Sequence, residues 1–406
     1  MFSSTSPIKW RQGIGRPRSS GRPESDAGAS DRVAPLRLLI AAGGTGGHVY
    51  PGIAVAEEWR RRHPDSEVVF VGTARGVEST AVPQAGFALR TIAARGIPRR
   101  LGFGVIRAVA ALIQSFVQAQ SLLRDLKPQV VVVTGGYVSG PVGLAAKLRG
   151  IPVVVQEQNS VPGATNRWLN LIADEVHISF VESRNYFRRR NNLKVTGNPI
   201  RRSLLRQDRT SAYEFLRLDP HRSTLLVFGG SRGATSINRA FQDALPRLTR
   251  LQNIQVLWQT GKDEAAAIRD RVKSLSIPVH VLPYLDQMEK AYAVADLAVC
   301  RAGAMTIAEL TACGVPSILI PYPHATHDHQ TVNARGLMER GAAEVIRDDE
   351  LEAEDLAKRI VQLFQDEPRL RRMARNARAF SRTNAAERLV TSIESLAGAV
   401  PAERMS

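Results

Sequence analysis

Two short glycine-rich segments are the parts of this sequence best suited to bind a phosphorylated ligand. Residues 43–48 read Gly-Gly-Thr-Gly-Gly-His, and residues 229–234 read Gly-Gly-Ser-Arg-Gly-Ala. Each segment follows an apolar run and precedes a helix-length stretch, and free N–H groups at the start of a helix attract anions. Neither segment matches a P-loop or a dinucleotide fingerprint. The pair therefore indicates another phosphate-bearing ligand, with tight helix packing as the alternative reason for the glycines.

Glu309 lies in a third segment of the same kind, residues 300–310, within the first turns of the expected helix. A carboxylate at this position can accept two hydrogen bonds from vicinal hydroxyls, which is how an acidic residue holds a ribose. The alternative is a salt bridge one helical turn away or an interaction with the helix dipole, either of which contributes only a few tenths of a kcal/mol. We expect the ribose role.

His48 follows the first glycine turn directly. A neutral imidazole at the mouth of this turn can accept a proton from an attacking hydroxyl, so His48 is a candidate general base. Helix capping or anion binding is an equally good interpretation of the same position.

A histidine-rich loop contains His324, His327, Asp328 and His329. All four residues belong to one loop, and no second group of ligands elsewhere in the sequence completes a zinc site. We therefore expect no metal and no cofactor. Instead, this loop and the adjacent Gln330 are predicted to contact hydroxyls of the ligand, with packing as the alternative.

The elements that must position these residues form a repeating pattern of apolar strand-like runs and amphipathic helical stretches, which is typical of parallel sheets covered by helices. The pattern pauses near residues 198–222 and then starts again. We expect two Rossmann-like domains, at 36–200 and 201–406, with the last helices returning to the first domain. The expected strands are 36–42, 67–71, 129–134, 152–156, 174–178, 224–228, 254–259, 278–282, 296–300, 316–321 and 343–346.

Composition narrows the function classes further. The formal net charge of +17 asks for an acidic partner, but aromatic residues are only 6% of the chain and are not interleaved with Lys and Arg as in nucleic-acid stacking surfaces. Residues 1–35 are rich in Ser, Gly, Pro and Arg and are interpreted as a disordered basic arm without a secretory signal. Cys300 and Cys313 lie in apolar stretches, which favours a reducing compartment without disulfides. The apolar stretch 105–119 is interrupted by Arg107, Gln114 and Gln118, so it is not expected to span a membrane.

Six motifs taken together resemble the MurG family of bacterial N-acetylglucosamine transferases. The resemblance covers residues 36 to about 398 in order, which makes it much more specific than any one motif. The six are GGTGGHVYP at 43–51, GGYVSGP at 135–141, QEQN at 156–159, GNPIR at 197–201, GGSRGA at 229–234, and the segment 301–309.

This resemblance implies an α/β GT-B fold with two facing Rossmann-like domains and an inverting, metal-independent transfer. The donor would be UDP-N-acetylglucosamine, and the acceptor would be the muramyl sugar of undecaprenyl-linked lipid I, giving lipid II for peptidoglycan. Leu285 would read uracil through its backbone with Tyr284 capping the base, and Glu309 would hold the ribose. The donor residues implied are Thr45, Gly46, Gly47, Asn159, Arg201, Ser231, Tyr284, Leu285, Ala304, Met305, Thr306, Ile307, Ala308, Glu309 and Gln330.

On the acceptor side, the resemblance implies that the lipid diphosphate faces His48 and the loop formed by Gly135, Gly136, Tyr137 and Ser139. Members of the family dock on the cytoplasmic face of the inner membrane. Here the apolar residues of 101–117, with Arg99, Arg100 and Arg107, would form a peripheral docking patch on anionic lipid. An ordinary core helix is the alternative interpretation of the same periodicity.

Two other functions share parts of this pattern. A UDP-N-acetylglucosamine 2-epimerase or another GT-B transferase has the same architecture, although the acceptor-side loop at 135–141 argues against an epimerase. A non-catalytic, basic, RNA-associated nucleotide-binding protein would share only the charge.

Overall fold

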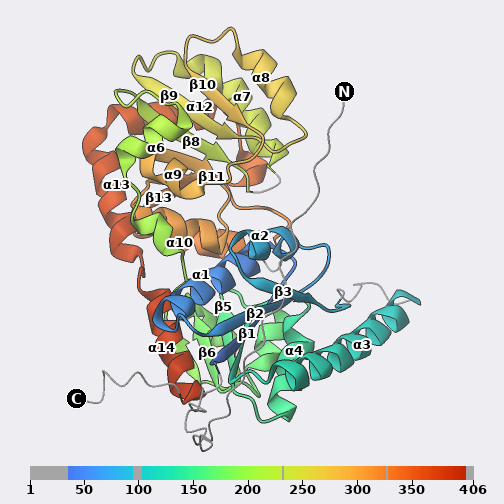
Figure 1. Ribbon diagram of the computed structural model, residues 1–406. Helices are drawn as coiled ribbons and strands as arrows, with labels where there is room; N and C mark the ends of the chain where they lie inside the picture. The colour runs from blue at the N-terminus through green and yellow to red at the C-terminus, as the bar shows by residue number, and fades with distance from the viewer. Residues whose placement is uncertain (1–34, 95–102, 231–232, 326–327, 399–406) are drawn as a thin grey trace, which may run out of the picture. The chain divides into compact units, whose positions relative to one another are not determined.

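A computed structural model describes residues 35–94, 103–230, 233–325 and 328–398 of the 406-residue chain, except for the side chains of 103–109. The proposed basic arm therefore lies almost wholly outside the described residues. Residues from Leu36 onward belong to one compact unit, which contains two sheets (Figure 1).

The first sheet has seven strands in the order β3-β2-β1-β4-β5-β6-β7, all parallel. Its central strands are nearly continuous runs of Val, Leu and Ile because helices bury both faces of a parallel sheet. The strands are β1 (Arg37–Ala42), β2 (Glu67–Gly72), β3 (Ala88–Thr91), β4 (Val130–Gly135), β5 (Val153–Glu157), β6 (Glu175–Ile178) and β7 (Leu193–Val195).

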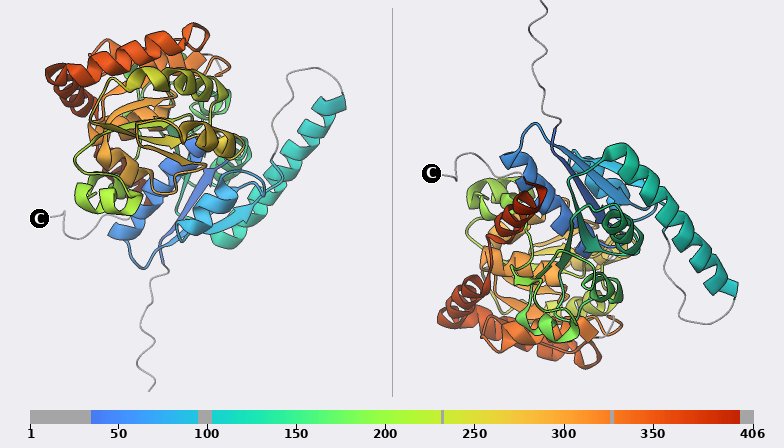
Figure 2. Two further views of the ribbon diagram at one scale, coloured as in Figure 1. Left: turned by 90° about the horizontal axis from the view of Figure 1, so that it is seen from above. Right: turned by 90° about the horizontal axis from the view of Figure 1, so that it is seen from below.

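Helices cover both faces of this sheet (Figure 2). They are α1 (Gly46–Arg62), α2 (Glu78–Gln84), α3 (Phe103–Leu126), α4 (Ser139–Leu148) and α5 (Ala164–Leu169), with a 3-10 turn at η1 (Val181–Tyr186). The α3 helix extends away from the sheet in all three ribbon views (Figures 1 and 2). No helix among the described residues is long and apolar enough to cross a bilayer.

The second sheet has six strands, again all parallel, in the order β10-β9-β8-β11-β12-β13. The strands are β8 (Ser223–Phe228), β9 (Ile254–Gln259), β10 (Val279–Leu282), β11 (Ala295–Cys300), β12 (Ser317–Leu319) and β13 (Ala343–Val345). The covering helices are α6 (Arg209–Leu216), α7 (Thr235–Leu248), α8 (Ala265–Val272), α9 (Met288–Val294), α10 (Ala304–Cys313), α11 (His329–Met338) and α12 (Ala353–Gln365), with 3-10 turns η2 (Arg202–Leu205) and η4 (Asp348–Glu350).

Amphipathic spacing explains how these helices pack. In α7, Ile237, Phe241 and Leu245 recur at four-residue intervals, and all three are buried against the second sheet. Phe241 also meets the buried Trp258 edge to face, with ring centroids 4.8 Å apart.

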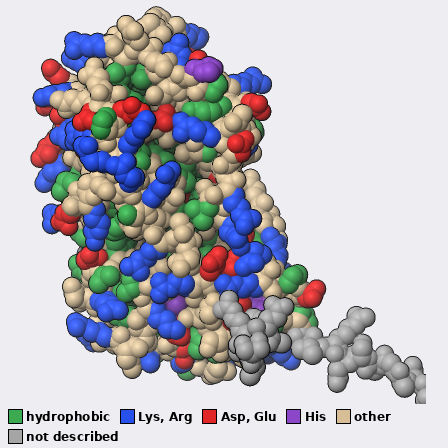
Figure 3. Space-filling view, turned by 90° about the vertical axis from the view of Figure 1, so that its left-hand side faces the viewer, with side chains coloured by type: hydrophobic (Ala, Val, Ile, Leu, Met, Phe, Trp, Pro, Cys, Tyr) green, Lys and Arg blue, Asp and Glu red, His purple; other side chains and the backbone are tan. Residues whose placement is uncertain are grey.

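The last two helices, α13 (Glu367–Phe380) and α14 (Ala385–Ala397), run from the second half of the chain back to the first. Leu389, Val390 and Ile393 of α14 are buried in the core formed by α1 and the first sheet. Arg62 of α1 reinforces this contact through its ion pair with Glu394, 3.0 Å away. Many Lys and Arg side chains are spread over the face shown in Figure 3, as the net charge of +17 requires.

Candidate active site

The strand orders place all four segments predicted to bind ligands where open α/β sheets bind them. In the first sheet, successive strands are added on one side of β1 up to β3 and then on its other side from β4 onward. The strand order of the second sheet reverses in the same way between β8 and β11. Ligands bind beyond the carboxyl ends of strands at such switch points. The first glycine turn follows β1, the 135–141 loop follows β4, the second glycine turn follows β8, and the 301–309 segment follows β11.

A pocket of about 600 Å³ collects predicted residues from both halves of the chain. The first half contributes the start of α1, and the second half contributes the turn after β8 and one side of α10. Predicted residues that line the pocket are Gly46, Gly47, Arg201, Tyr284, Leu285, Met305, Thr306 and Glu309. Tyr50 and Gly230 also line it and belong to the two glycine-rich motifs, whereas Glu57, Gln259 and Tyr292 lie outside every motif that the sequence offered.

Glu309 is the most perturbed carboxyl group of this pocket. Burial raises its pKa to about 7, opposed by the charge of Arg201 and by a hydrogen bond from the Tyr292 hydroxyl, 3.0 Å from Oε2. Glu309 of α10 thus faces α9 as a hydrogen-bond acceptor, and the burial of its charge is only partly offset. This is the chemistry expected of a group that receives hydroxyl donors from a ligand.

Arg201 brings a positive charge into the same pocket. It donates to Glu289 across 3.2 Å, and its guanidinium carbon lies 5.7 Å from the centre of the Tyr50 ring. Its Nε atom is buried and has no hydrogen-bond partner among the described residues. An unsatisfied guanidinium N–H beside a pocket is suited to an anionic ligand.

Tyr50 and Tyr284 face each other from the two halves, with their hydroxyl oxygens 3.5 Å apart. Burial is the main cause that raises the pKa of Tyr50 well above its ordinary value. Both side chains provide apolar ring surface with a polar tip at the pocket.

Gln259, at the end of β9, organises the second glycine turn. Its Nε2 donates to the Gly230 carbonyl at 2.8 Å, and its Oε1 accepts from the Leu285 N–H at 2.9 Å. The Leu285 amide N–H is therefore used inside the protein. A polar residue at the carboxyl end of a predicted strand was the sequence signal for Gln259.

The helix α10 divides its predicted residues between two sides. Met305, Thr306 and Glu309 line the pocket just described, whereas Ala304, Ile307 and Ala308 line a second cavity of about 780 Å³ on the other side of the helix. Helical periodicity requires this division, because residues three and four apart share a face. Side chains of Ala304, Ile307 and Ala308 are thus placed away from the pocket that contains Glu309.

A buried carboxylate that sequence reasoning missed, Glu78, supports the first glycine turn. Its oxygens accept from the N–H groups of Gly44 at 2.9 Å and Thr73 at 2.8 Å, and from the Thr73 hydroxyl at 2.6 Å. The Gly44 N–H is therefore not available to a phosphate. The turn also lies against the loop after β4: a Cβ at Gly136 would collide with the Gly43 carbonyl oxygen, and Gly136 has φ +82°.

His48 is held at the junction of these two loops. Its Nδ1 lies 3.1 Å from the Thr134 carbonyl oxygen and 3.0 Å from Oε1 of Gln158. The Thr134 hydroxyl donates in turn to the His48 carbonyl at 2.7 Å. A Cβ at Gly135 would come within 2.5 Å of the imidazole, so glycine is required for the ring to occupy this place.

Profiles of one glycosyltransferase family match both halves of the chain. The profile for the glycosyltransferase family 28 N-terminal domain matches residues 38–178, and the profile for its C-terminal domain matches 224–389. A Myxococcus xanthus relative is 44% identical over 355 residues, which is 87% of this chain and 91% of the relative. Its name is UDP-N-acetylglucosamine–N-acetylmuramyl-(pentapeptide) pyrophosphoryl-undecaprenol N-acetylglucosamine transferase. The crystal structure of Acinetobacter baumannii MurG is 31% identical, covers 89% of this chain and 100% of its own, and has a TM-score of 0.69.

The chain belongs to the MurG family of glycosyltransferases. The predicted family and the predicted α/β fold with two parallel sheets are confirmed. A UDP-N-acetylglucosamine 2-epimerase structure also matches, with a TM-score of 0.65 over 92% of this chain and 98% of its own, but at 14% identity it shares only the fold.

The 135–141 loop, which was predicted to face the acceptor, has both exposed and buried residues. Tyr137 is 60% exposed. Ser139 is fully buried, and its hydroxyl is hydrogen bonded to the N–H of Gly135 at 3.0 Å and to the Gly135 carbonyl at 2.7 Å. The Ser139 hydroxyl therefore fixes the positive-φ turn at Gly135 and Gly136 and does not face a ligand in this conformation.

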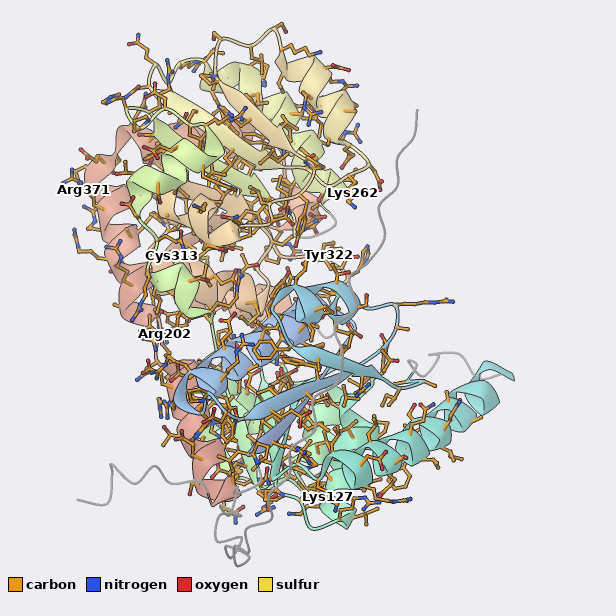
Figure 4. The ribbon with its side chains drawn as sticks, viewed as in Figure 1. Lys127, Arg202, Lys262, Cys313, Tyr322 and Arg371 are labelled. Atoms are coloured by element: carbon orange, nitrogen blue, oxygen red, sulfur yellow. The ribbon has the colours of Figure 1, made fainter. Side chains whose placement is uncertain are left out.

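The remaining predicted donor residues lie outside the lining of the pocket. Asn159 is held by the buried Glu157, which accepts from its backbone N–H at 2.9 Å. Gln330 receives the Tyr322 N–H on Oε1 at 2.9 Å, in a loop labelled by Tyr322 in Figure 4. Thr45 precedes α1 and is exposed. Ser231 lies outside the described residues.

The histidine-rich loop is only partly described, because His327 lies outside the described residues. His324 stacks edge to face on Tyr322, with ring centroids 5.6 Å apart. Within the described part of the chain, no group of three or more His, Cys, Asp or Glu side chains is placed to hold a metal ion.

Proposed function

We propose that this chain transfers N-acetylglucosamine from UDP-N-acetylglucosamine to the muramyl sugar of lipid I, with inversion at the sugar carbon and without a metal ion. The names of the MurG-family relatives support this substrate pair. The observation that carries the proposal is the pocket in which Gly46 and Gly47 of the first half meet Arg201 and Glu309.

UDP fits the second-half side of this pocket. The Glu309 carboxylate would accept hydrogen bonds from the ribose hydroxyls, with Tyr284 beside the base and the Leu285 carbonyl as its backbone partner. Arg201 and the N-terminal end of α10 would attract the diphosphate, because helix N-termini carry partial positive charge. Residues 201–406 would thus bind the donor, and residues 36–200 the acceptor.

The reaction requires a base on one side of the sugar and charge stabilisation on the other. His48 is the candidate base that would take the proton from the acceptor hydroxyl as its oxygen attacks the anomeric carbon. The bond from that carbon to the diphosphate breaks, and UDP leaves with the electron pair. Arg201 and the helix dipole would stabilise the departing charge in the role that a metal ion has in other transferases.

Peripheral binding to the cytoplasmic face of the cell membrane fits the described part of α3. Leu112, Ile113 and Val117 are large apolar residues on this helix that are 46%, 60% and 61% exposed. These apolar side chains lie on a helix that extends away from the sheet, and the chain carries a net charge of +17. Both features suit binding to an anionic lipid surface. Phe116 of the predicted patch is instead partly buried against the core of the first sheet. The other patch members, including Arg99 and Arg100, lie outside the described residues or side chains.

Incubation of the purified chain with UDP-N-acetylglucosamine in the absence of acceptor tests this proposal against its nearest alternative. Nuclear magnetic resonance of the sugar nucleotide should show no change at the sugar C2 position. With a lipid I analogue added, the sugar should appear in a disaccharide product. Epimerised UDP-sugar without acceptor would instead assign the chain to the epimerases.

A further inference from the structure

Gln158 is a buried residue in direct contact with the candidate base His48. Its side chain is 1% exposed and lies between His48 and the end of β5. It belongs to the QEQN motif at 156–159. Its amide group is in contact with His48 on one side and with backbone carbonyls on the other.

The orientation of this amide is fixed by its neighbours. Nε2 donates to the Thr134 carbonyl at 2.6 Å and to the Gln156 carbonyl at 3.1 Å, and it also contacts Gln156 Oε1. If the amide were flipped, an oxygen would face these acceptors and the donors would be lost. Oε1 of Gln158 is therefore the atom that faces His48, 3.0 Å from Nδ1.

The ring nitrogen Nδ1 of His48 then faces two acceptors, Oε1 of Gln158 and the carbonyl oxygen of Thr134 at 3.1 Å. Neither of these oxygens can donate, so Nδ1 must carry the hydrogen. In a neutral imidazole the other nitrogen, Nε2, is then unprotonated. No hydrogen bond to Nε2 is present among the described residues.

We propose that Gln158 is a positioning residue that holds neutral His48 in its Nδ1-protonated form, so that Nε2 is ready to accept the proton of the acceptor hydroxyl. This inference rests on the proposed function for the identity of the reaction. During transfer the hydroxyl proton moves to Nε2 as the new oxygen–carbon bond forms and UDP departs. The resulting imidazolium keeps its Nδ1–H bonds to Gln158 and Thr134, which stabilise the positive charge.

The network continues from Gln158 to the second half of the chain. Asn198 Nδ2 donates to the Gln158 carbonyl at 3.1 Å and to the Ala304 carbonyl at 3.4 Å. The Asn198 side chain therefore links Gln158, which contacts His48, to Ala304, the first residue of α10. Asn198 Oδ1 also accepts from Gln156 Nε2 at 3.1 Å. This bond holds Gln156, which in turn accepts hydrogen bonds from Gln158.

The first experiment measures the tautomer directly and does not require activity. Nitrogen-15 spectra of histidine-labelled protein, assigned by comparison with His48→Ala, should show His48 protonated at Nδ1 and unprotonated at Nε2 in the neutral form. Gln158→Met, which keeps the length of the side chain but removes both amide groups, should shift the population toward the Nε2-protonated form. A wild-type His48 that is protonated at Nε2 would overturn the inference, even if the transferase reaction is found.

The second experiment is a double-mutant cycle on turnover. Gln158→Met should lower kcat by about tenfold, with little change in KM for the donor, because a correctly protonated general base contributes about 10²–10⁴-fold. In the His48→Ala background the same change should have almost no effect on kcat. Unchanged UDP affinity in both variants confirms that the second half is folded. Equal effects of Gln158→Met with and without His48 would show a purely structural role and contradict the proposal.

Discussion

The Tyr292 hydroxyl donates to the Glu309 carboxylate across 3.0 Å, which joins α9 to α10 beneath the pocket that both halves line. This bond fixes the carboxylate from one side. It offsets only part of the burial that raises the pKa of Glu309 to about 7. Hydroxyl groups of a ligand that donate hydrogen bonds to Glu309 would offset more of the cost of burying its charge.

Glu309→Gln should weaken the binding of UDP by about 10- to 100-fold, because hydrogen bonds to a charged group contribute about 1.5–3 kcal/mol. Isothermal titration with UDP measures the change. Glu350→Gln is a matched control, since Glu350 is 66% exposed and pairs only with Arg347 at 3.5 Å among the described residues. Equal affinities for wild type and Glu309→Gln would rule out the ribose role.

Uridine affinity should increase as pH rises from 6 to 8. Only the ionised carboxylate accepts from both ribose hydroxyls, and with a pKa of about 7 its ionised fraction rises about tenfold over this range. Uridine is used because it lacks the titrating phosphate of UDP. The same group affects folding with the opposite sign: its raised pKa favours the folded state most at low pH, and this contribution is lost between about pH 4.3 and 7. A flat uridine profile in the wild type, or the same slope in Glu309→Gln, would contradict the assignment.

Glu78→Gln should loosen the first glycine turn. One of its side-chain atoms would become a donor facing the N–H groups of Gly44 and Thr73, which costs about 1–3 kcal/mol when the group is buried. Hydrogen exchange of the Gly44 amide should become faster by about tenfold or more. Glu67→Gln is the control: Glu67 is half-exposed, its pair with Arg37 lies at the surface, and surface pairs contribute at most about 1 kcal/mol. Unchanged Gly44 exchange would mean that Glu78 does not support the turn.

The double variant Ile113→Asp and Val117→Asp should reduce binding to vesicles that contain anionic lipid by about 30-fold. Each side chain is more than half exposed, and each would lose about 1 kcal/mol of apolar burial in the membrane. Co-sedimentation with vesicles measures the change. Phe215→Asp, an equally apolar and 54% exposed position on α6, should leave binding unchanged. If both variants bind like the wild type, the α3 surface is not the docking surface.

Much of the fold could be predicted because parallel strands buried on both faces read as apolar runs. Each of the eleven expected strands has a counterpart. The two that were missed, β3 and β7, are at the edges of the first sheet, where strands have exposed and polar positions such as Arg90 and Lys194. Periodicity alone cannot separate such short edge strands from loops.

The candidate site was predictable only where its residues belong to a local motif. Gly46, Gly47, Arg201 and Glu309 have such motifs, and the structure brings them to one pocket. Glu78 lies 34 positions from the Gly44 amide that it binds, and Gln158 lies 110 positions from His48. Contacts of this kind depend on strand order, which no sequence spacing reports. For Ser139 the motif predicted a contact with the ligand, but its hydroxyl donates to the Gly135 carbonyl within the turn.

The most direct test of the central claim is the product formed from UDP-N-acetylglucosamine and a lipid I analogue in the presence of a metal chelator. We predict that UDP release requires both substrates, continues at an unchanged rate with the chelator, and yields a disaccharide with the anomeric configuration inverted relative to the donor. Release of UDP that needs a divalent metal, or a product that retains the donor configuration, would contradict the account.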